Sequence, residues 1–336
     1  MELYLDSADF KEIQEASQLG FLTGLTTTPT FMHREGITDI DEAIQKLSKM
    51  VPILQIEALG NNAKEIYNEA HRLLEIGLEK EKTVFKIPVS LEGIKACKML
   101  NDEGIMVNVH LVYTLQQAYM AMQAGAKYVC PLVGRLQDQG HDALALIEQA
   151  VKAVNYYKYD SKIMFSSVRH AEHVRNAINI GVHTITAPWK IIKQLTENTF
   201  TTIGTEQFFT HTKLITMKVK NIVRQENPVV TLDEDILAAI IKMTESGLGA
   251  VSVVDDEGNI KGIFTDGDLR RSLKTYGKDI LHKKMSEFKF NYPICLDAEA
   301  MLDDAVQIFK EKNIDNIIIT HQNKLFGMLD IQDLVK

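Results

Sequence analysis

At 336 residues the chain is longer than one hydrophobic core usually serves, so we expect two domains. Its net charge of −8 argues against a nucleic-acid-binding surface, and no apolar stretch approaches the ~20 residues that span a membrane. The 3 cysteines are scattered without a CxxC pair, which disfavours a disulfide scaffold or a zinc site. A strand pattern begins at residue 2, in place of a signal peptide. We therefore expect a cytoplasmic protein that binds neither nucleic acid nor membrane.

Short β-rich runs alternate with amphipathic helical patterns up to about residue 212. Strands are expected at residues 2–6, 20–27, 53–58, 83–89, 106–112, 128–133, 162–168 and 184–187. Helices are expected between them at residues 39–50, 63–78, 91–101, 115–124, 142–156 and 171–180. This alternation favours parallel pairing and predicts an α/β fold, a (β/α)₈ TIM barrel. A doubly wound open sheet is the structural alternative, although no GxGxxG follows the first strand to support its dinucleotide-binding form.

The chain from about residue 217 onward contains an internal duplication. A proline-led apolar run at residues 228–232 recurs at 293–296, and the segment at 262–269 recurs at 327–334, both 65 residues later. Each unit is expected to run helix, strand, turn, strand, helix, with strands at 250–254 and 260–264, then at 316–320 and 324–329. Residues 212–220 are the expected connection to the first domain.

Lys86 lies inside the apolar run of residues 83–89, which reads as a buried strand ended by Pro88. A charged amine is costly to bury, so the ordinary interpretation is a strand-end lysine whose amine reaches solvent. The alternative is a buried amine that is held neutral and attacks a carbonyl carbon.

Other polar residues also fall at the carboxyl ends of the expected strands, where parallel barrels carry out catalysis. Each has an ordinary explanation as a helix cap, a turn, a core histidine or a surface charge. Together they place a carboxylate, a lysine and two arginines at one barrel mouth, a pattern that suits a phosphorylated carbonyl substrate. These residues are Asp6, Thr26, Thr27, Thr28, Gln55, Asn108, His110, Arg135, Ser167 and Arg169.

Five segments in this order resemble the transaldolase family, and most of all its fructose-6-phosphate aldolase-like branch. They are residues 1–6 (MELYLD), 24–29 (GLTTTP), 86–89 (KIPV), 128–135 (YVCPLVGR) and 167–169 (SVR). The resemblance covers residues 1–212 and implies a homo-oligomeric, metal-independent class I aldolase barrel without a cofactor. It implies that Lys86 is the Schiff-base nucleophile, that Asp6 shuttles protons and that Thr26 orients a catalytic water. Arg135 and Ser167 would hold the substrate phosphate, with Thr28, Asn108 and Arg169 beside the substrate.

Three positions depart from the family pattern, namely Thr28, His110 and Leu132, where asparagine, threonine and an aromatic residue are usual. Gln55 matches the aldolase branch, whereas transaldolases proper have glutamate there. The chain is therefore expected to lack both the tyrosine and the glutamate that the two branches use for acid–base work. One hypothesis is that His110 takes over part of the proton transfer. The alternative is that His110 only reshapes the pocket for another sugar.

The duplicated region resembles a tandem pair of CBS domains, and residues 262–271 resemble that region of arabinose-5-phosphate isomerases. We therefore expect a barrel over residues 1–212 and a smaller α+β CBS module over 213–336, with units at about 217–275 and 281–336. The resemblance implies that Thr265 and Asp268 contact the ribose of an adenine nucleotide or sugar nucleotide, with Asp333 as the second-copy counterpart. The alternative is a packing or dimerisation module.

Two classes of function follow. The first is a Schiff-base aldolase or transaldolase acting on a sugar phosphate, with a ligand-binding CBS module. The second is a catalytically altered barrel that serves as a sugar-phosphate sensor or regulatory scaffold.

Overall fold

The computed structural model describes residues 1–224, 227–290 and 292–334. Contacts divide the chain into two compact units, residues 1–197 and 198–336. In the first unit, eight parallel strands close into a barrel in sequential order, which confirms the predicted fold. The strands are β1 (Glu2–Asp6), β2 (Gly24–Thr26), β3 (Leu54–Glu57), β4 (Thr83–Pro88), β5 (Met106–Val112), β6 (Tyr128–Pro131), β7 (Lys162–Phe165) and β8 (Thr184–Ala187).

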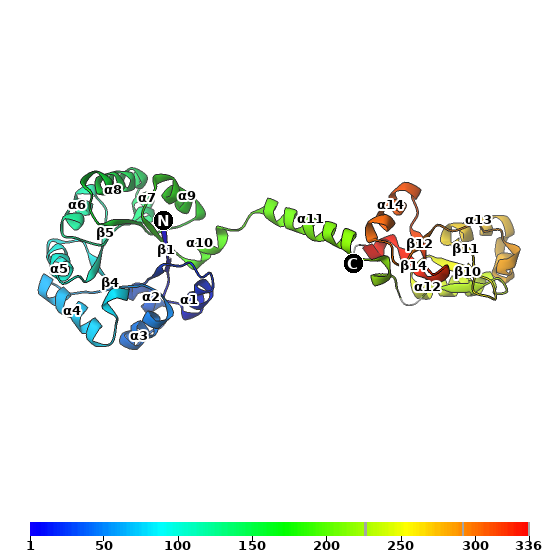
Figure 1. Cartoon of the computed structure of the whole chain (residues 1–336), viewed down its shortest axis with the longest axis horizontal. Helices are drawn as coiled ribbons and strands as arrows, with labels where there is room; N and C mark the ends of the chain where they lie inside the picture. The colour runs from blue at the N-terminus through cyan, green and yellow to red at the C-terminus, as the bar shows by residue number, and fades with distance from the viewer. Residues whose placement is uncertain (225–226, 291, 335–336) are drawn as a thin grey trace. The chain divides into compact units, whose positions relative to one another are not determined.

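Helices follow every strand and cover the outside of the barrel (Figure 1). Most begin at a side chain that caps free backbone N–H groups, as Ser90 does for α5. Leucine, isoleucine and alanine on their inner faces pack against the outward side chains of the strands in one core. The helices are α1 (Phe10–Ser17), α2 (Pro29–Arg34), α3 (Ile40–Met50), α4 (Ala63–Glu75), α5 (Leu91–Asp102), α6 (Leu115–Gln123), α7 (Val133–Asp138), α8 (Ala143–Tyr157), α9 (Ala171–Ile180) and α10 (Trp189–Gln194).

The barrel interior is a separate, layered core. Successive residues of a strand point to opposite faces, so every second residue points into the barrel. Tyr4, Val84, Tyr128 and Met164 pack together in one interior cluster. The hydroxyls of Tyr4 and Tyr128 lie 2.9 Å apart, and burial raises the pKa of both phenols. Two residues further along, the inward positions of β1 and β4 belong to the polar side chains Asp6 and Lys86, and Ser166 follows β7, whereas Cys130 on β6 stays in the apolar cluster. The polar residues form the barrel mouth.

The second unit contains two three-stranded sheets with the same order of elements, which confirms the duplication. Each has a short first strand parallel to the middle strand. The sequence does not predict these strands, because three residues are too few to show periodicity. The first repeat comprises β9 (Val229–Thr231), α12 (Ile236–Ser246), β10 (Ala250–Val254), β11 (Ile260–Thr265) and α13 (Asp266–Tyr276). The second comprises β12 (Cys295–Asp297), α14 (Leu302–Lys312), β13 (Asn316–His321), β14 (Lys324–Asp330) and, in place of the expected last helix, a short 3₁₀ turn, Ile331–Leu334.

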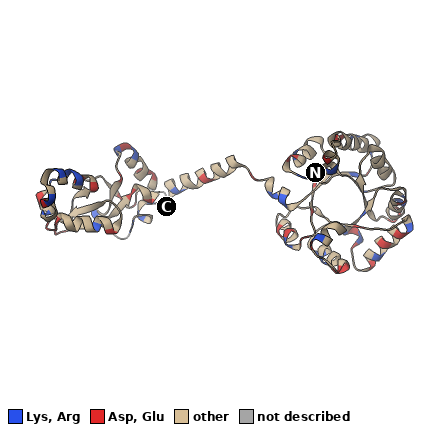
Figure 2. Cartoon of the chain, turned by 180° about the vertical axis from the view of Figure 1, so that it is seen from behind, with Lys and Arg blue, Asp and Glu red and all other residues tan. Residues whose placement is uncertain are grey.

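The expected connection at residues 212–220 falls partly within a long helix, α11 (Thr199–Thr216), and the expected boundary at 212/213 lies inside it. Residues after α11 join the second repeat, because Val219 donates a backbone hydrogen bond to Ala300. The expected second CBS unit also includes residues 335 and 336, which lie outside the described residues. Within the described chain, no helix is both long and apolar enough to cross a membrane. Acidic and basic residues are interspersed on the helices of both units (Figure 2).

Candidate active site

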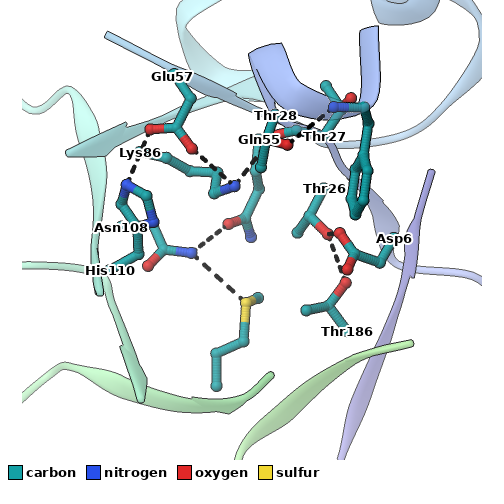
Figure 3. A network of polar contacts seen from close by, with 12 residues as sticks. Asp6, Thr26, Thr27, Thr28, Gln55, Glu57, Lys86, Asn108, His110 and Thr186 are labelled. Carbon is teal, nitrogen blue, oxygen red and sulfur yellow. Dashed lines mark hydrogen bonds and ion pairs between the residues drawn. The ribbon is translucent and has the colours of Figure 1, made fainter. Parts of the chain in front are cut away.

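Lys86 points into the barrel mouth from β4, where its register neighbours are Glu57 on β3 and Asn108 on β5. Only 7% of its side chain is exposed, so the strand-end interpretation with a hydrated amine does not hold. The amine donates a hydrogen bond to the carbonyl oxygen of Thr27 at 3.0 Å and lies 3.1 Å from a carboxylate oxygen of Glu57 (Figure 3). The amine is thereby held at a fixed point of the mouth.

Glu57 lies between two basic groups. One carboxylate oxygen contacts Lys86, and the other lies 2.9 Å from Nε2 of His110 (Figure 3). Burial raises the pKa of Glu57, but the Lys86 charge and the contact with His110 outweigh burial and hold that pKa below its ordinary value. Burial lowers the pKa of His110, so near pH 7 a neutral imidazole faces an ionised carboxylate. The favourable tautomer carries the ring proton on Nε2, because two lone pairs 2.9 Å apart would repel each other.

A second polar group on the mouth joins β1, β2 and β8. The hydroxyl of Thr26 lies 2.8 Å from a carboxylate oxygen of Asp6 and 2.5 Å from the hydroxyl of Thr186. A threonine hydroxyl has one hydrogen to donate, so Thr26 donates to Asp6 and accepts from Thr186. Burial raises the pKa of Asp6, although Lys86 and Thr26 oppose that effect. Asp6 is therefore a carboxyl group able to hold and return a proton.

Gln55 and Asn108, two residues before Glu57 and His110 on β3 and β5, bind each other, with the Asn108 amide donating to the Gln55 carbonyl oxygen at 2.6 Å. Asn108 also reaches the sulfur of Met164. Nε2 of Gln55 and Oδ1 of Asn108 are buried and have no partner among the described residues. These two atoms could each be satisfied by a bound water or by a hydroxyl group.

The expected phosphate-binding residues lie on α7 and on the loop between β7 and α9. Ser167 has a left-handed backbone with φ of 57°, a strained conformation that often marks a functional position. Gly134 packs so tightly against it that an added Cβ would lie 2.0 Å from the Ser167 carbonyl oxygen. Arg135 is exposed, and Arg169 pairs with Asp138 at 2.9 Å. Both guanidinium groups can therefore reach an anion from solvent.

Thr28 and Leu132 have structural positions in this mouth. The Thr28 hydroxyl accepts a hydrogen bond from the backbone of Phe31 and caps α2, so its side chain is already used locally. Leu132 is buried and forms a bridge with Ser166 that extends the barrel between β6 and β7.

Among the residues that the structure describes, no group of three or more metal-ligating side chains occurs.

Two residues of the mouth were not predicted, Glu57 and Thr186. Position 55 is glutamine, as the family comparison described, but a different glutamate, Glu57, lies beside the Lys86 amine. A strand period of two could have found it, since Gln55 faces inward and Glu57 is two residues later on the same strand. Comparison with the family at Gln55 alone concealed this second position.

In the second unit, Thr265 and Asp268 bind each other at the start of α13. The Thr265 hydroxyl donates to Asp268 at 2.7 Å, and the backbone of each is bound by the side chain of the other. Asp333 is buried and accepts two hydrogen bonds from Arg224, at 2.8 and 3.0 Å. A ribose would have to displace these internal partners. A pocket includes the first residue of α13 and is lined by Ile240, Met243, Thr244, Gly247, Gly249 and Asp266.

Comparison with known proteins agrees with this architecture. A family model described as transaldolase/fructose-6-phosphate aldolase matches residues 3–239, and a CBS domain model matches residues 219–275 and 280–336. A "Probable transaldolase" from Thermoanaerobacter sp. (strain X514) is 39% identical over 210 residues, which cover 62% of this chain and 95% of that protein. A "Probable transaldolase 2" from Bacillus anthracis is 34% identical over 214 residues, covering 62% and 96%.

Among solved structures, a CBS-domain containing protein from Agrobacterium tumefaciens matches with 23% identity and a TM-score of 0.33, over 35% of this chain and 90% of that one. The match of the first family model extends over more than half of the sequence. The chain therefore belongs to the transaldolase/fructose-6-phosphate aldolase family and carries a tandem pair of CBS domains.

Proposed function

We propose that the barrel is a Schiff-base aldolase or transaldolase that cleaves or transfers a dihydroxyacetone unit of a sugar phosphate, with Lys86 as the nucleophile. The observation that carries the proposal is the position of the Lys86 amine, nearly dehydrated and fixed on the mouth between Thr27 and Glu57. Asp6 supports the proposal as well, because burial raises the pKa of this carboxyl group and so makes the carboxylate a better proton acceptor near the amine.

In the proposed reaction the neutral Lys86 amine attacks the keto carbon, and loss of water from the carbinolamine gives an iminium. The iminium accepts the electron pair of the C3–C4 bond, while the proton of the C4 hydroxyl passes to the Asp6 carboxylate. The products are an aldehyde and an enamine bound to Lys86. Protonation and hydrolysis of the enamine release dihydroxyacetone, whereas capture by a second aldehyde completes a transaldol reaction. Thr26 would help to orient the hydrolytic water through its hydrogen bond to Asp6.

We assign the phosphate of the substrate to Arg135, Ser167 and Arg169. The two guanidinium groups are accessible, and the strained Ser167 backbone presents its hydroxyl beside α7. Arginine suits a phosphate because its planar donors match two phosphate oxygens. This assignment places the phosphate on the β6–β7 side of the mouth and the keto carbon at β4.

Borohydride trapping tests the proposal. The full-length chain is incubated with dihydroxyacetone, fructose 6-phosphate and a panel of ketose phosphates, reduced, and mapped by peptide mass spectrometry. We expect a covalent adduct on Lys86 that is absent in Lys86→Met and unchanged in Lys95→Met, which removes an exposed lysine of α5. Absence of an adduct with every ketose would overturn the enzyme proposal and support the sugar-phosphate sensor.

For the CBS pair we propose binding of an adenine nucleotide or sugar nucleotide, supported by the family match and by the pocket that includes Asp266. The ligand would take Thr265 and Asp268 as ribose partners, and Asp333 only if it releases Arg224. Calorimetric titration with AMP, ATP and a sugar nucleotide tests this, and no heat with any of them would contradict it. The homo-oligomeric state of the chain stays a prediction, which light scattering can measure. The resemblance to arabinose-5-phosphate isomerases also stays a prediction.

A further inference from the structure

Glu57 is the carboxylate that directly contacts the Lys86 amine, and its second oxygen is occupied by His110. We propose that Glu57 is a catalytic acid–base residue of Schiff-base formation, taking a proton from the Lys86 ammonium and returning it to the departing hydroxyl, and that His110 positions it. This inference rests on the proposed function of Lys86. It replaces the hypothesis that His110 itself transfers protons, because His110 faces Glu57 through its only N–H.

The surroundings of Glu57 favour this assignment over the other groups at the mouth. The Thr27 carbonyl oxygen also contacts the amine but cannot take its proton. Asp6 acts on Lys86 only through its charge and is engaged by Thr26. The remaining titratable groups whose charges reach this cluster, Cys130 on β6 and Arg135 on α7, make no direct contact with the amine among the described residues.

Every proton that moves during Schiff-base formation is exchanged among Lys86, Glu57 and the substrate. The Lys86 ammonium gives one proton to the Glu57 carboxylate, and the free amine adds to the keto carbon. A proton then moves from nitrogen to oxygen within the adduct, which gives the neutral carbinolamine. Glu57 returns its proton to the carbinolamine hydroxyl, which leaves as water while the nitrogen lone pair forms the iminium. The carboxylate is regenerated beside the new cation, so the pair of opposite charges is restored in a site that is largely shielded from bulk solvent.

His110 is a positioning residue in this scheme. It is 9% exposed as a residue, and Nε2 of its neutral ring lies 2.9 Å from the Glu57 carboxylate, a polar contact that holds the rotamer of Glu57 and lowers the pKa of its carboxyl group. A glutamine at this position can offer an amide N–H at nearly the same distance from the backbone, whereas leucine offers none. The pair His110→Gln and His110→Leu therefore separates donation of a hydrogen bond from filling of space.

The rate of adduct formation is the direct test, measured by mixing the full-length protein with dihydroxyacetone and reducing with borohydride at timed intervals. We expect Glu57→Gln to form the Lys86 adduct ~10²–10⁴-fold more slowly than wild type. Glu75→Gln, at an exposed position of α4, should match wild type. Added formate should restore part of the rate to Glu57→Ala, because it supplies the missing carboxylate.

Different results separate the two proposals. If the wild-type protein forms no adduct, both the proposed function and this inference are contradicted. A Glu57→Gln variant as fast as wild type, or a Glu57→Ala deficit that formate leaves unchanged, overturns the inference alone. The pH dependence of the rate of adduct formation tests the role of His110. Loss of the polar contact between His110 and Glu57 should raise the pKa of Glu57. The midpoint of the fall in rate at low pH should therefore move about one pH unit upward in His110→Leu but not in His110→Gln. Equal midpoints in both variants would contradict its positioning role.

Discussion

Replacement of Lys86 by methionine tests the buried ion pair itself. The variant keeps the volume of the side chain but leaves the Glu57 carboxylate in a site where only 6% of its side chain is exposed. At 3.1 Å the two charges attract by about 5 kcal/mol at an effective dielectric constant of ~20. Removal of one partner of a buried pair typically costs ~3–5 kcal/mol. The 2.9 Å contact with His110 remains in the variant, so we expect a loss of unfolding free energy near ~3 kcal/mol.

The assay is urea unfolding followed by the fluorescence of Trp189, the single tryptophan of the chain, which is 8% exposed on α10 and reports on the barrel. Lys86→Met should lower the unfolding free energy at pH 7, and the double variant with Glu57→Gln should recover most of the loss because no unpaired charge remains. Equal stability of wild type and Lys86→Met at pH 7, or a double variant less stable than the single one, would refute the reasoning.

The loss should also depend on pH. The folded-state pKa of Glu57 lies below its ordinary value of 4.5, so the carboxylate contributes stability above that value and loses it as the pH falls through the folded pKa. Lys86→Met lacks the main cause of this depression. The difference between wild type and variant should therefore be full at pH values above both folded pKa values of Glu57. It should shrink as the pH falls through the pKa of Glu57 in the variant, which burial raises, and vanish below the lower pKa in wild type.

Three further predictions concern other parts of the chain. Gly134→Ala places a Cβ 2.0 Å from the Ser167 carbonyl oxygen. KM for a phosphorylated substrate should rise roughly tenfold, or ~1.4 kcal/mol, and should rise more than KM for the unphosphorylated analogue. Equal changes in the two KM values would argue against a phosphate site there. Asp6→Asn should lower turnover ~10²–10⁴-fold while the Lys86 adduct still forms, and a variant that cannot be trapped would show a different role for Asp6. Thr265→Ala removes the side chain that caps α13 and should lower the unfolding free energy of the second unit by about 1 kcal/mol. The change should appear in unfolding followed by circular dichroism but not in Trp189 fluorescence. An unchanged dichroism transition would exclude that contribution.

Local sequence patterns were enough to predict the barrel. Its strands are apolar runs bounded by helix caps and turns, and helices of matching length recur between them, so the order of elements leaves few possible topologies. The ends of the strands were less predictable. The expected strand at 20–27 shortens to Gly24–Thr26 because backbone pairing, which depends on neighbouring strands, sets its limits.

The sequence by itself determined that Lys86 lies on a buried strand, that Asp6 and Thr26 end the first two strands and that His110 lies near the end of the fifth, since strand period and parallel order fix these positions. Only the tertiary structure decided which side chains meet. Glu57 reaches both Lys86 and His110 because the register of β3, β4 and β5 brings inward positions of three strands together, and register depends on contacts between segments far apart in sequence. The same holds for Thr186, which is 160 residues from Thr26 along the chain and becomes its partner only when β8 closes the barrel against β1.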